Sequence, residues 1–249
     1  MIPIGRSRRR LHRRAFLGYF GRGTAALAIL GPIGVACGEQ SSESGSGTAP
    51  TESDSEGSWS RVVLGSVSAY VLARNNELAV VDTGRPGSLD AIGQTISDLG
   101  FTFNDVKHLA LTHHHPDHVG SIGAVQDAAV NATSYAGVLD LERISADDIV
   151  GVGDGDEIMG MQVIHTPGHT EGHICLLDSL TTTLVAGDAM NGADGGVTGA
   201  NPSFTPDMET AGESIKKLAQ LEFDTVYFGH GEPVSGGAGA AVRDLAGQL

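Results

Sequence analysis

From Arg61 onward, short apolar runs alternate with polar turn segments, a pattern typical of mixed strands and helices. Runs rich in Val, Leu, Ile and Ala predict strands at residues 62–64, 67–73, 77–82, 106–111, 161–164, 173–177, 182–186 and 225–228. Apolar positions spaced three and four residues apart predict helices at residues 88–99, 119–128, 207–221 and 238–249. The mixture predicts a fold of the α/β class.

Five of the expected strands run directly into His or Asp residues that stand beside Gly or Pro. The segments are Val81-Asp82-Thr83-Gly84, Thr112-His113-His114-His115-Pro116-Asp117-His118, His165-Thr166-Pro167-Gly168-His169, Ala186-Gly187-Asp188 and Gly229-His230-Gly231. Ligand sites in sheet proteins tend to form where strands exit on one edge. We therefore expect these polar side chains to converge in one cleft.

The spacing in the His-rich segment suits two metal ions. Alternate side chains of an extended segment point the same way, so His113 and His115 are expected to face one metal. Pro116 then ends the strand, and Asp117 and His118 are expected to face a second metal beside the first. Nitrogen and oxygen ligands of this kind favour zinc.

Three further residues are expected to complete the two ligand sets. His169 supplies a third His to the first metal, His230 completes the second, and Asp188 bridges the two. Two metals roughly 3.5–4 Å apart hold one bridging hydroxide and lower the pKa of its parent water towards ~7. Such a hydroxide attacks a carbonyl or phosphoryl group without a Ser or Cys nucleophile, so Asp117 and Asp188 are predicted to be catalytic as well as metal-binding.

The set of motifs resembles that of the metallo-β-lactamase-fold hydrolases. The resemblance rests on residues 112–120, the loop 166–170, Gly187-Asp188 and Gly229-His230-Gly231, and it covers residues 61–235. It implies a four-layer αββα sandwich with the metals at one edge. It also implies that Asp82 supports the metal loop rather than binding metal. We expect His173 to orient the His169 loop through a hydrogen bond.

Departures from the family pattern narrow the predicted activity. Asp188 occupies a position where true β-lactamases of the family carry Cys or Ser. The pattern is closer to glyoxalase II-like thioesterases and to lactonases, and it predicts hydrolysis of a small-molecule ester, lactone or thioester with two Zn²⁺ per chain. Glyoxalase II has a C-terminal helical domain that helps to bind glutathione, whereas this chain ends soon after His230, so glutathione specificity is not expected.

Two other functions remain open from the sequence. Enzymes that resemble persulfide dioxygenases share the His-rich motif and use a single iron held by two His and an Asp, here His115, His169 and Asp188 or their neighbours. The third hypothesis is a surface-tethered, non-catalytic metal-binding protein.

The charge of the chain is unevenly distributed. The whole sequence has 15 basic and 30 acidic side chains, and seven of the Arg residues but no acidic residue precede Cys37. The remaining chain carries a formal charge of −22. Because such a surface repels phosphates, nucleic acid is not expected as a partner.

The first 60 residues have the composition of an export signal and a tether. Arg13-Arg14-Ala15-Phe16-Leu17 resembles a twin-arginine signal, and Gly34-Val35-Ala36-Cys37 resembles a lipobox in which Cys37 is lipidated. We expect a signal at residues 1–37, a flexible Ser/Gly-rich acidic tether at 38–60 and the metallo-hydrolase domain at 61–249. The protein would then be exported and held at the outer face of the cytoplasmic membrane, touching the membrane only through its N-terminal anchor. The alternative is an ordinary cleaved signal with a spare Cys.

Overall fold

The computed structural model describes residues 56–249, so the predicted signal, Cys37 and most of the predicted tether lie outside the described residues. The first sheet contains six strands in the order β1-β2-β3-β4-β5-β6. Their bounds are β1 (Ser58–Leu64), β2 (Val67–Arg74), β3 (Glu77–Val81), β4 (Val106–Leu111), β5 (Thr133–Gly137) and β6 (Ile149–Val152). β1, β2 and β3 are antiparallel, whereas β3 to β6 run parallel.

The second sheet contains six strands in the order β14-β13-β10-β9-β8-β7. Their bounds are β7 (Glu157–Ile158), β8 (Met161–His165), β9 (Ile174–Asp178), β10 (Thr183–Val185), β13 (Thr225–Tyr227) and β14 (Val234–Ser235). Neighbouring strands are antiparallel except β10 and β13, which are parallel. A separate hairpin is formed by β11 (Met190–Ala193) and β12 (Gly196–Gly199).

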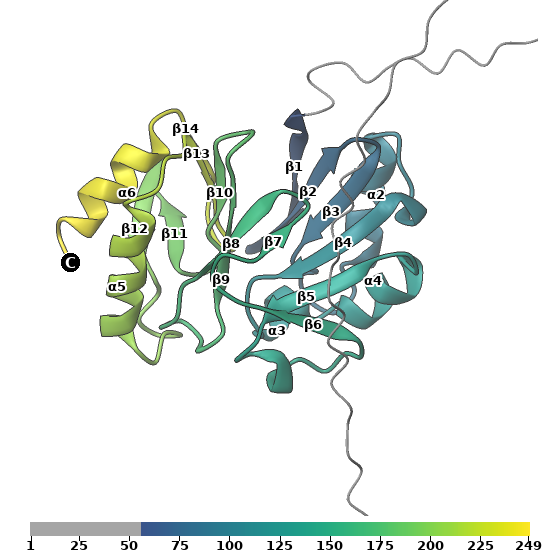
Figure 1. Cartoon of the computed structure of the whole chain (residues 1–249), viewed down its shortest axis with the longest axis horizontal. Coiled ribbons are helices and arrows are strands. Elements are labelled where there is room, and N and C mark those ends of the chain that lie inside the picture. The colour runs from purple at the N-terminus through teal and green to yellow at the C-terminus, as the bar shows by residue number, and fades with distance from the viewer. Residues whose placement is uncertain (1–55) are drawn as a thin grey trace, which may run out of the picture. The chain divides into compact units, whose positions relative to one another are not determined.

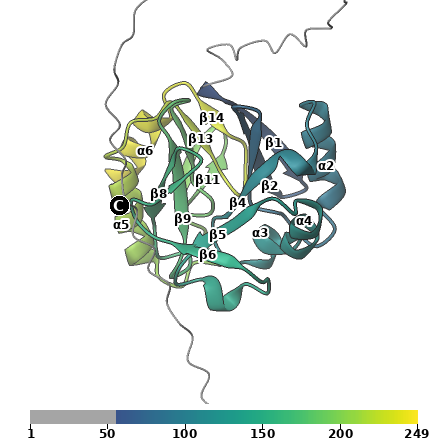
Figure 2. The same cartoon turned by 45° about the vertical axis from the view of Figure 1, so that its right-hand side comes forward.

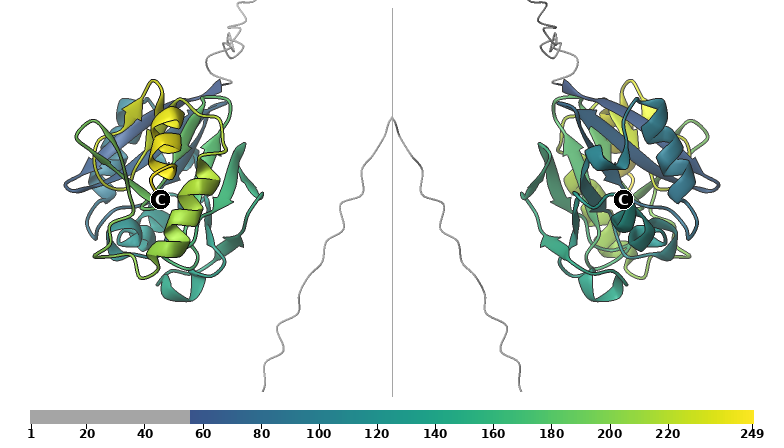
Figure 3. Two further views of the ribbon diagram at one scale, coloured as in Figure 1. Left: turned by 90° about the vertical axis from the view of Figure 1, so that its left-hand side faces the viewer. Right: turned by 90° about the vertical axis from the view of Figure 1, so that its right-hand side faces the viewer.

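Helices cover the outer face of each sheet. Those beside the first sheet are α2 (Leu89–Asp98), α3 (Pro116–Val119) and α4 (Ile122–Ala128), and those beside the second are α5 (Met208–Leu218) and α6 (Ala238–Ala246). Two single-turn 3₁₀ helices, η1 (Phe103–Asp105) and η2 (Leu141–Arg143), lie in connections of the first half. Figure 1 shows the layers side by side, and Figure 2 shows the same order after a turn of 45°. The two opposite views of Figure 3 show the yellow-green pair of helices on one face and the blue-teal helices on the other.

Three apolar clusters hold the layers together, and strand alternation assigns residues to them. In β2, Ala69 and Val71 pack under the helices of the first sheet, while Tyr70 and Leu72 point into the space between the sheets. This follows from the two-residue period of a strand. A third cluster joins the second sheet to α5 and α6. The predicted four-layer αββα sandwich is therefore confirmed.

The structure corrects several predicted element bounds. The predicted helix 119–128 is in fact two short helices separated at Gly120 and Ser121. The first of them begins at Pro116, earlier than predicted. A Cβ at Gly120 would lie 2.4 Å from the carbonyl oxygen of Pro116, which explains why glycine stands at this break. β1 begins at Ser58, inside the last residues predicted as tether. Within residues 56–249, no helix is long and apolar enough to cross a membrane.

Candidate metal centre

The seven predicted ligands lie together, as expected from the strand exits. Four of them follow β4 in the first sheet: His113, His115, Asp117 and His118. The other three, His169, Asp188 and His230, follow β8, β10 and β13 of the second sheet. They form three overlapping groups whose ligand atoms lie within 4.8 Å of one another: His113, His115 and His169; His113, His118 and Asp188; Asp117, His118 and His230.

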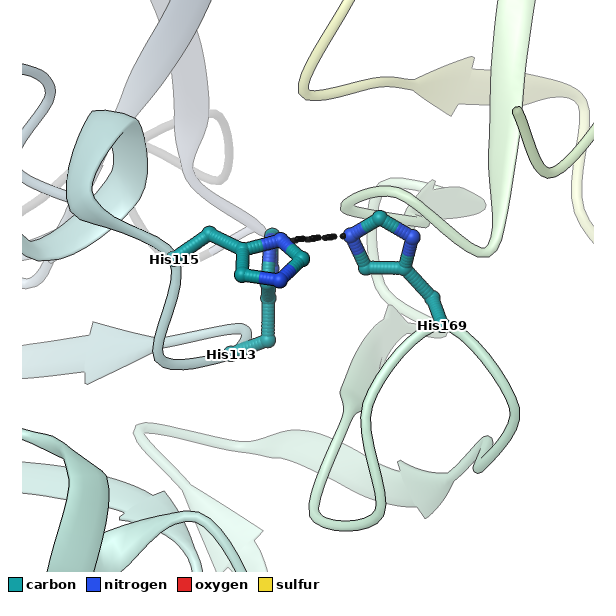
Figure 4. A group of neighbouring side chains, drawn as sticks. All are labelled: His113, His115 and His169. Atoms are coloured by element: carbon teal, nitrogen blue, oxygen red, sulfur yellow. Dashed lines mark hydrogen bonds between the residues drawn. The ribbon is translucent and has the colours of Figure 1, made fainter. Parts of the chain in front are cut away.

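The first group is a triangle of imidazole nitrogens (Figure 4). The Nε2 atom of His113 lies 3.1 Å from Nδ1 of His115 and 3.2 Å from Nε2 of His169, and the latter two atoms are 2.9 Å apart. A tetrahedral zinc ion with Zn–N bonds of about 2.0–2.1 Å holds its nitrogens about 3.3 Å apart. The triangle therefore has nearly the edge lengths that a zinc ion requires.

The electrostatics of this group favour a cation that accepts lone pairs. Burial lowers the pKa of all three imidazoles, to about 4 for His169 and well below the usual range for His113. The rings are therefore neutral at neutral pH, and neutral imidazole is the form that binds metal.

Hydrogen bonds on the far side of two rings fix which nitrogen faces the group. The hydroxyl of Thr112 donates to the Asp82 carboxylate at 2.8 Å, so its oxygen accepts the hydrogen bond of 3.1 Å from Nδ1 of His113. The Nε2 lone pair of His113 is thereby left for a metal. His169 is held in the same way by a 3.0 Å hydrogen bond between its Nδ1 and the hydroxyl of Thr205.

The second metal group consists of Asp117, His118 and His230 with Asp188 beside them, so it combines two histidines with two carboxylates. The set of His113, His118 and Asp188 joins it to the first group. Nε2 of His230 lies 3.4 Å from Oδ2 of Asp117 and 3.4 Å from Oδ2 of Asp188. His118 contributes its Nε2, which lies 3.3 Å from Oδ1 of Asp188. The backbone carbonyl of Ser66 accepts a hydrogen bond of 2.6 Å from Nδ1 of His230, so the Nε2 of that ring is the atom available for a metal.

Charge makes this second group different from the first. Hydrogen bonds to Asp117 and Asp188 raise the pKa of His230 to about 10. Burial opposes the charging of His118, but the carboxylates of Asp82 and Asp188 outweigh it and raise its pKa to about 10. His230 in turn lowers the pKa of Asp117 to about 2. Without a metal the two histidines are cations, so a metal ion entering this group displaces their protons.

Asp188 lies between the two groups. Its Oδ2 atom is 3.5 Å from Nε2 of His169 in the first group and 3.4 Å from Nε2 of His230 in the second. Its Oδ1 atom and the Nε2 atom of His118 are buried and lie 3.3 Å apart, but neither meets a hydrogen-bond partner in favourable geometry within the described residues. Buried polar atoms without partners are rare in proteins, and atoms that serve as ligands of a cation account for them. The donor set therefore fits two cations with Asp188 shared.

Asp82 does not face the cluster, and it supports two ligands instead. Its carboxylate accepts a hydrogen bond of 2.7 Å from Nδ1 of His118 and one of 2.8 Å from the backbone N–H of Thr112. It thus orients both the His118 ring and the loop that begins at Thr112. His173 contacts both the His169 loop and Asp188. Its Nδ1 forms a hydrogen bond of 2.8 Å with the hydroxyl of Thr166, at the start of the loop that carries His169, and its Nε2 accepts a hydrogen bond of 3.1 Å from the Asp188 backbone N–H.

Asp140 is a supporting residue that the sequence patterns missed. It is fully buried after β5 and accepts hydrogen bonds from the backbone N–H of His114 at 3.0 Å, the hydroxyl of Thr170 at 2.7 Å and the backbone N–H of Gly172 at 2.8 Å. These contacts join the loop after β4 to the loop that carries His169. The one signal in the sequence was an acidic residue between two leucines at 139–141.

A cavity of about 570 Å³ opens over the cluster. Five of the predicted ligands line it: His115, Asp117, His169, Asp188 and His230. Its other walls are formed by Ser66, Arg85, Pro116, Asn191, Asn201 and Phe204. The volume suits a small-molecule substrate rather than a macromolecule.

The fold and the His/Asp cluster define a metallo-hydrolase type of protein, and the comparisons with known proteins agree. The family model described as the Metallo-beta-lactamase superfamily matches residues 62–230. The chain belongs to this family, whose members typically bind zinc and are mostly hydrolases.

Its relatives include an uncharacterized protein, a hydrolase and a lactonase. YobT of Bacillus subtilis, an uncharacterized protein, is 29% identical over 67% of this chain and 83% of its own length. A hydroxyacylglutathione hydrolase of Aeromonas hydrophila is 30% identical over 64% of this chain and 58% of its own length. An N-acyl homoserine lactonase of a Bacillus species is 31% identical over 57% of this chain and 62% of its own length. The matches thus span less than two thirds of the hydrolase and the lactonase.

Solved structures agree on the fold. A metallo-beta-lactamase family protein of Thermus thermophilus superimposes with a TM-score of 0.62 at 23% identity, covering 76% of this chain and 78% of its own. At this identity the likeness shows the fold alone.

Proposed function

We propose that the protein is a binuclear zinc hydrolase that cleaves a small-molecule ester, thioester or lactone. The observation that carries the proposal is Asp188, whose Oδ2 atom lies within 3.5 Å of a nitrogen ligand from each of the two groups. A carboxylate in that position is suited to bridge two cations and leave an open position for water.

The residues of the site would have separate metal-binding and supporting roles. His113, His115 and His169 would hold one zinc ion, Asp117, His118 and His230 the other, and Asp188 both. Zinc ions held there would lower the pKa of a bound water and would polarise the substrate carbonyl. Asp82 and His173 hold His118 and Asp188 in place, and the cavity admits the substrate from solvent.

The relatives support the type of bond. Proteins named hydroxyacylglutathione hydrolase and N-acyl homoserine lactonase are similar to this chain over more than half of its length. A thioester and a lactone both present a carbonyl carbon with a heteroatom leaving group. The same set of ligands therefore suits either substrate class.

The experiment that tests the proposal is elemental analysis of the purified protein, followed by a turnover assay. About two zinc ions per chain, together with hydrolysis of at least one thioester or lactone, is the expected result. A matched His230→Ala variant should retain about one zinc ion, because the first group does not include His230.

Other results would identify the alternatives. About one iron per chain and oxygen uptake with a persulfide would replace the proposal with a dioxygenase-like enzyme. Two zinc ions without turnover of any thioester, ester or lactone would favour a metal-binding protein that is not a catalyst.

We also propose that the N-terminal segment exports the protein and anchors it through Cys37. The support is the order of a twin arginine, an apolar stretch and a cysteine, followed by a Ser/Gly-rich acidic segment. Mass spectrometry of the mature protein tests this. A diacylated Cys37 at the new N-terminus is expected, and an intact Met1 would contradict it.

A further inference from the structure

Arg85 lines the metal-site cavity and forms no ion pair with an acidic residue in the described part of the chain. Eight Lys and Arg residues lie in the described part of the chain, and five of them form ion pairs: Arg61, Arg74, Lys216, Lys217 and Arg243. Within residues 56–249, Arg85 pairs with no carboxylate, although acidic residues far outnumber basic ones. It is also the sole Lys or Arg among the described residues that line this cavity.

Ser66 connects Arg85 to the metal cluster. The Nη2 group of Arg85 donates to the Ser66 hydroxyl at 2.8 Å, while the Ser66 carbonyl accepts the 2.6 Å hydrogen bond from Nδ1 of His230. One residue of the turn between β1 and β2 therefore places the guanidinium next to a histidine of the second group.

Hydrogen bonds also fix the backbone of the loop that carries Arg85. The hydroxyl of Ser121 donates to the Arg85 carbonyl at 2.6 Å, and the backbone N–H of Thr83 donates to the carbonyl of His118 at 2.7 Å. The loop that carries Arg85 is thereby fixed to α3 and α4, the helices that follow the His-rich segment.

The guanidinium retains free donors for a ligand. It has five N–H groups, and the bond to Ser66 is its one side-chain hydrogen bond within the described residues. Two parallel N–H groups on a planar guanidinium match the two oxygens of a carboxylate. The carboxylates that line the same cavity, Asp117 and Asp188, already face histidines of the cluster and do not neutralise Arg85.

We propose that Arg85 binds a carboxylate of the substrate, so that this site selects esters or thioesters that carry a negative charge. The inference rests on the proposed hydrolase function. Phe204, whose side chain is 65% exposed, lines the same cavity and offers an apolar surface for the hydrocarbon part of the substrate. Arg85 thus determines specificity, and the bond-breaking chemistry remains with the metal cluster.

The test compares a charged and an uncharged substrate in the zinc-loaded full chain. The substrates are the N-acetylcysteamine thioesters of succinate and of succinate monomethyl ester, which differ in one carboxylate. In Arg85→Gln, KM for the charged thioester should rise about 10- to 100-fold with kcat nearly unchanged, because a charge-assisted hydrogen-bonded pair is lost. KM for the methyl ester should not change, and Arg85→Lys should lie between the wild type and Arg85→Gln.

Arg143→Gln is the matched control. Arg143 is also exposed and without an ion pair in the described residues, but it lines a different cavity. Its substitution removes the same charge from the protein and should change neither KM. An equal rise of KM for both thioesters in Arg85→Gln would overturn the inference, since Arg85 would then affect the shape of the cavity without distinguishing charged from uncharged substrates.

Calorimetric titration with succinate separates this inference from the proposed function. Succinate should bind at least tenfold more weakly to Arg85→Gln than to the wild type, whether or not the protein turns over. Equal binding would overturn the role of Arg85. If the wild type turns over no thioester, ester or lactone but still binds succinate through Arg85, the hydrolase proposal fails and the carboxylate site stands.

Discussion

The carboxylate of Asp82 and the ring of His118 are joined by a hydrogen bond of 2.7 Å between Oδ2 and Nδ1, on the side of the ring that faces away from the cluster. Asp82 also has a positive φ of 61°. A residue after a strand therefore adopts a left-handed conformation and uses it to support a metal ligand. Asn tolerates this conformation at least as well as Asp, so an Asn substitution removes the charge with little backbone strain.

Asp82→Asn should weaken binding at the second metal group by about 10- to 100-fold, because outer carboxylates orient and polarise ligand histidines. Zinc titration against a competing chelator measures this as loss of the weaker of two sites. Asp90→Asn, an exposed acidic residue in the first turn of α2, is the control and should leave both affinities unchanged. Unchanged zinc affinity in Asp82→Asn would show that the His118 ring does not depend on this bond.

Gly229 leaves room for the cluster, and Ala at this position should not fit. A Cβ there would lie 2.1 Å from Oδ1 of Asp188 and 2.5 Å from Cε1 of His118. Gly229→Ala should therefore displace one of these two ligands and reduce hydrolysis at least tenfold, with about 1–3 kcal/mol lost from the free energy of unfolding.

Gly212→Ala is the control for this substitution. Gly212 lies within α5, and a Cβ added there would have no heavy atom within 4 Å, so Ala should raise helix stability by about 0.5–1 kcal/mol. Metal analysis and thermal unfolding distinguish the two variants. Full zinc content in Gly229→Ala would contradict the predicted collision.

Arg74 and Asp178 form a buried ion pair between the two sheets. The Nη2 group of Arg74 lies 2.8 Å and 2.7 Å from the two carboxylate oxygens of Asp178, and their side chains are 4% and 0% exposed. Asp178→Ala leaves the guanidinium buried without its partner. The free energy of unfolding should fall by about 3–5 kcal/mol, measured by urea denaturation followed by circular dichroism.

The exposed pair Lys216–Glu213 supplies the comparison. Lys216→Ala should change the free energy of unfolding by less than about 1 kcal/mol, because solvent screens that pair. Losses of similar size in the two variants would mean that the buried pair does not hold the sheets together.

Cys175 should be an unreactive thiol. It is fully buried in β9, and burial raises its pKa from 9.0 to about 12. In a Cys37→Ser background, the native protein should not react with a thiol reagent, whereas the protein in urea should react fully. Rapid labelling of the native state would contradict the burial.

The same shift makes stability depend on alkaline pH. Above pH 9 the Cys175 thiol of the unfolded chain loses its proton, whereas the folded chain keeps it up to about pH 12. The free energy of unfolding is therefore unaffected by this thiol below pH 9 and falls as the pH rises from 9 to about 12. Cys175→Ala should show a shallower loss than the wild type between pH 9 and 10. Parallel curves would contradict the prediction.

Local sequence patterns were sufficient to predict the strands that lead to the metal site. Every strand that leads to a ligand was predicted within two residues, because each is a short apolar run that ends at polar residues, Gly or Pro. β5 and β6 were missed, since runs such as Thr133–Gly137 mix small and polar residues and become strands by pairing with β4 and with each other. The short strands β7, β11, β12 and β14 were missed as well, because two to four residues are too few to show an alternating pattern.

The supporting residues were harder to predict than the ligands. His113 and His230 belong to compact motifs, so the sequence itself marks them. Asp140 and Ser66 support the metal cluster through hydrogen bonds to residues 26 or more positions away, and no spacing along the chain reveals such partners. The predicted signal, tether and lipid attachment remain predictions from composition.

Each metal group takes ligands from both sheets. His113, His115, Asp117 and His118 follow a strand of the first sheet, while His169, Asp188 and His230 follow strands of the second. Neither half of the described chain contains a complete group, so the proposed zinc ions would act as cross-links between the halves. Two fragments divided at the turn 153–156 would each carry half of every site, and their reassembly would depend on the concentration of free zinc.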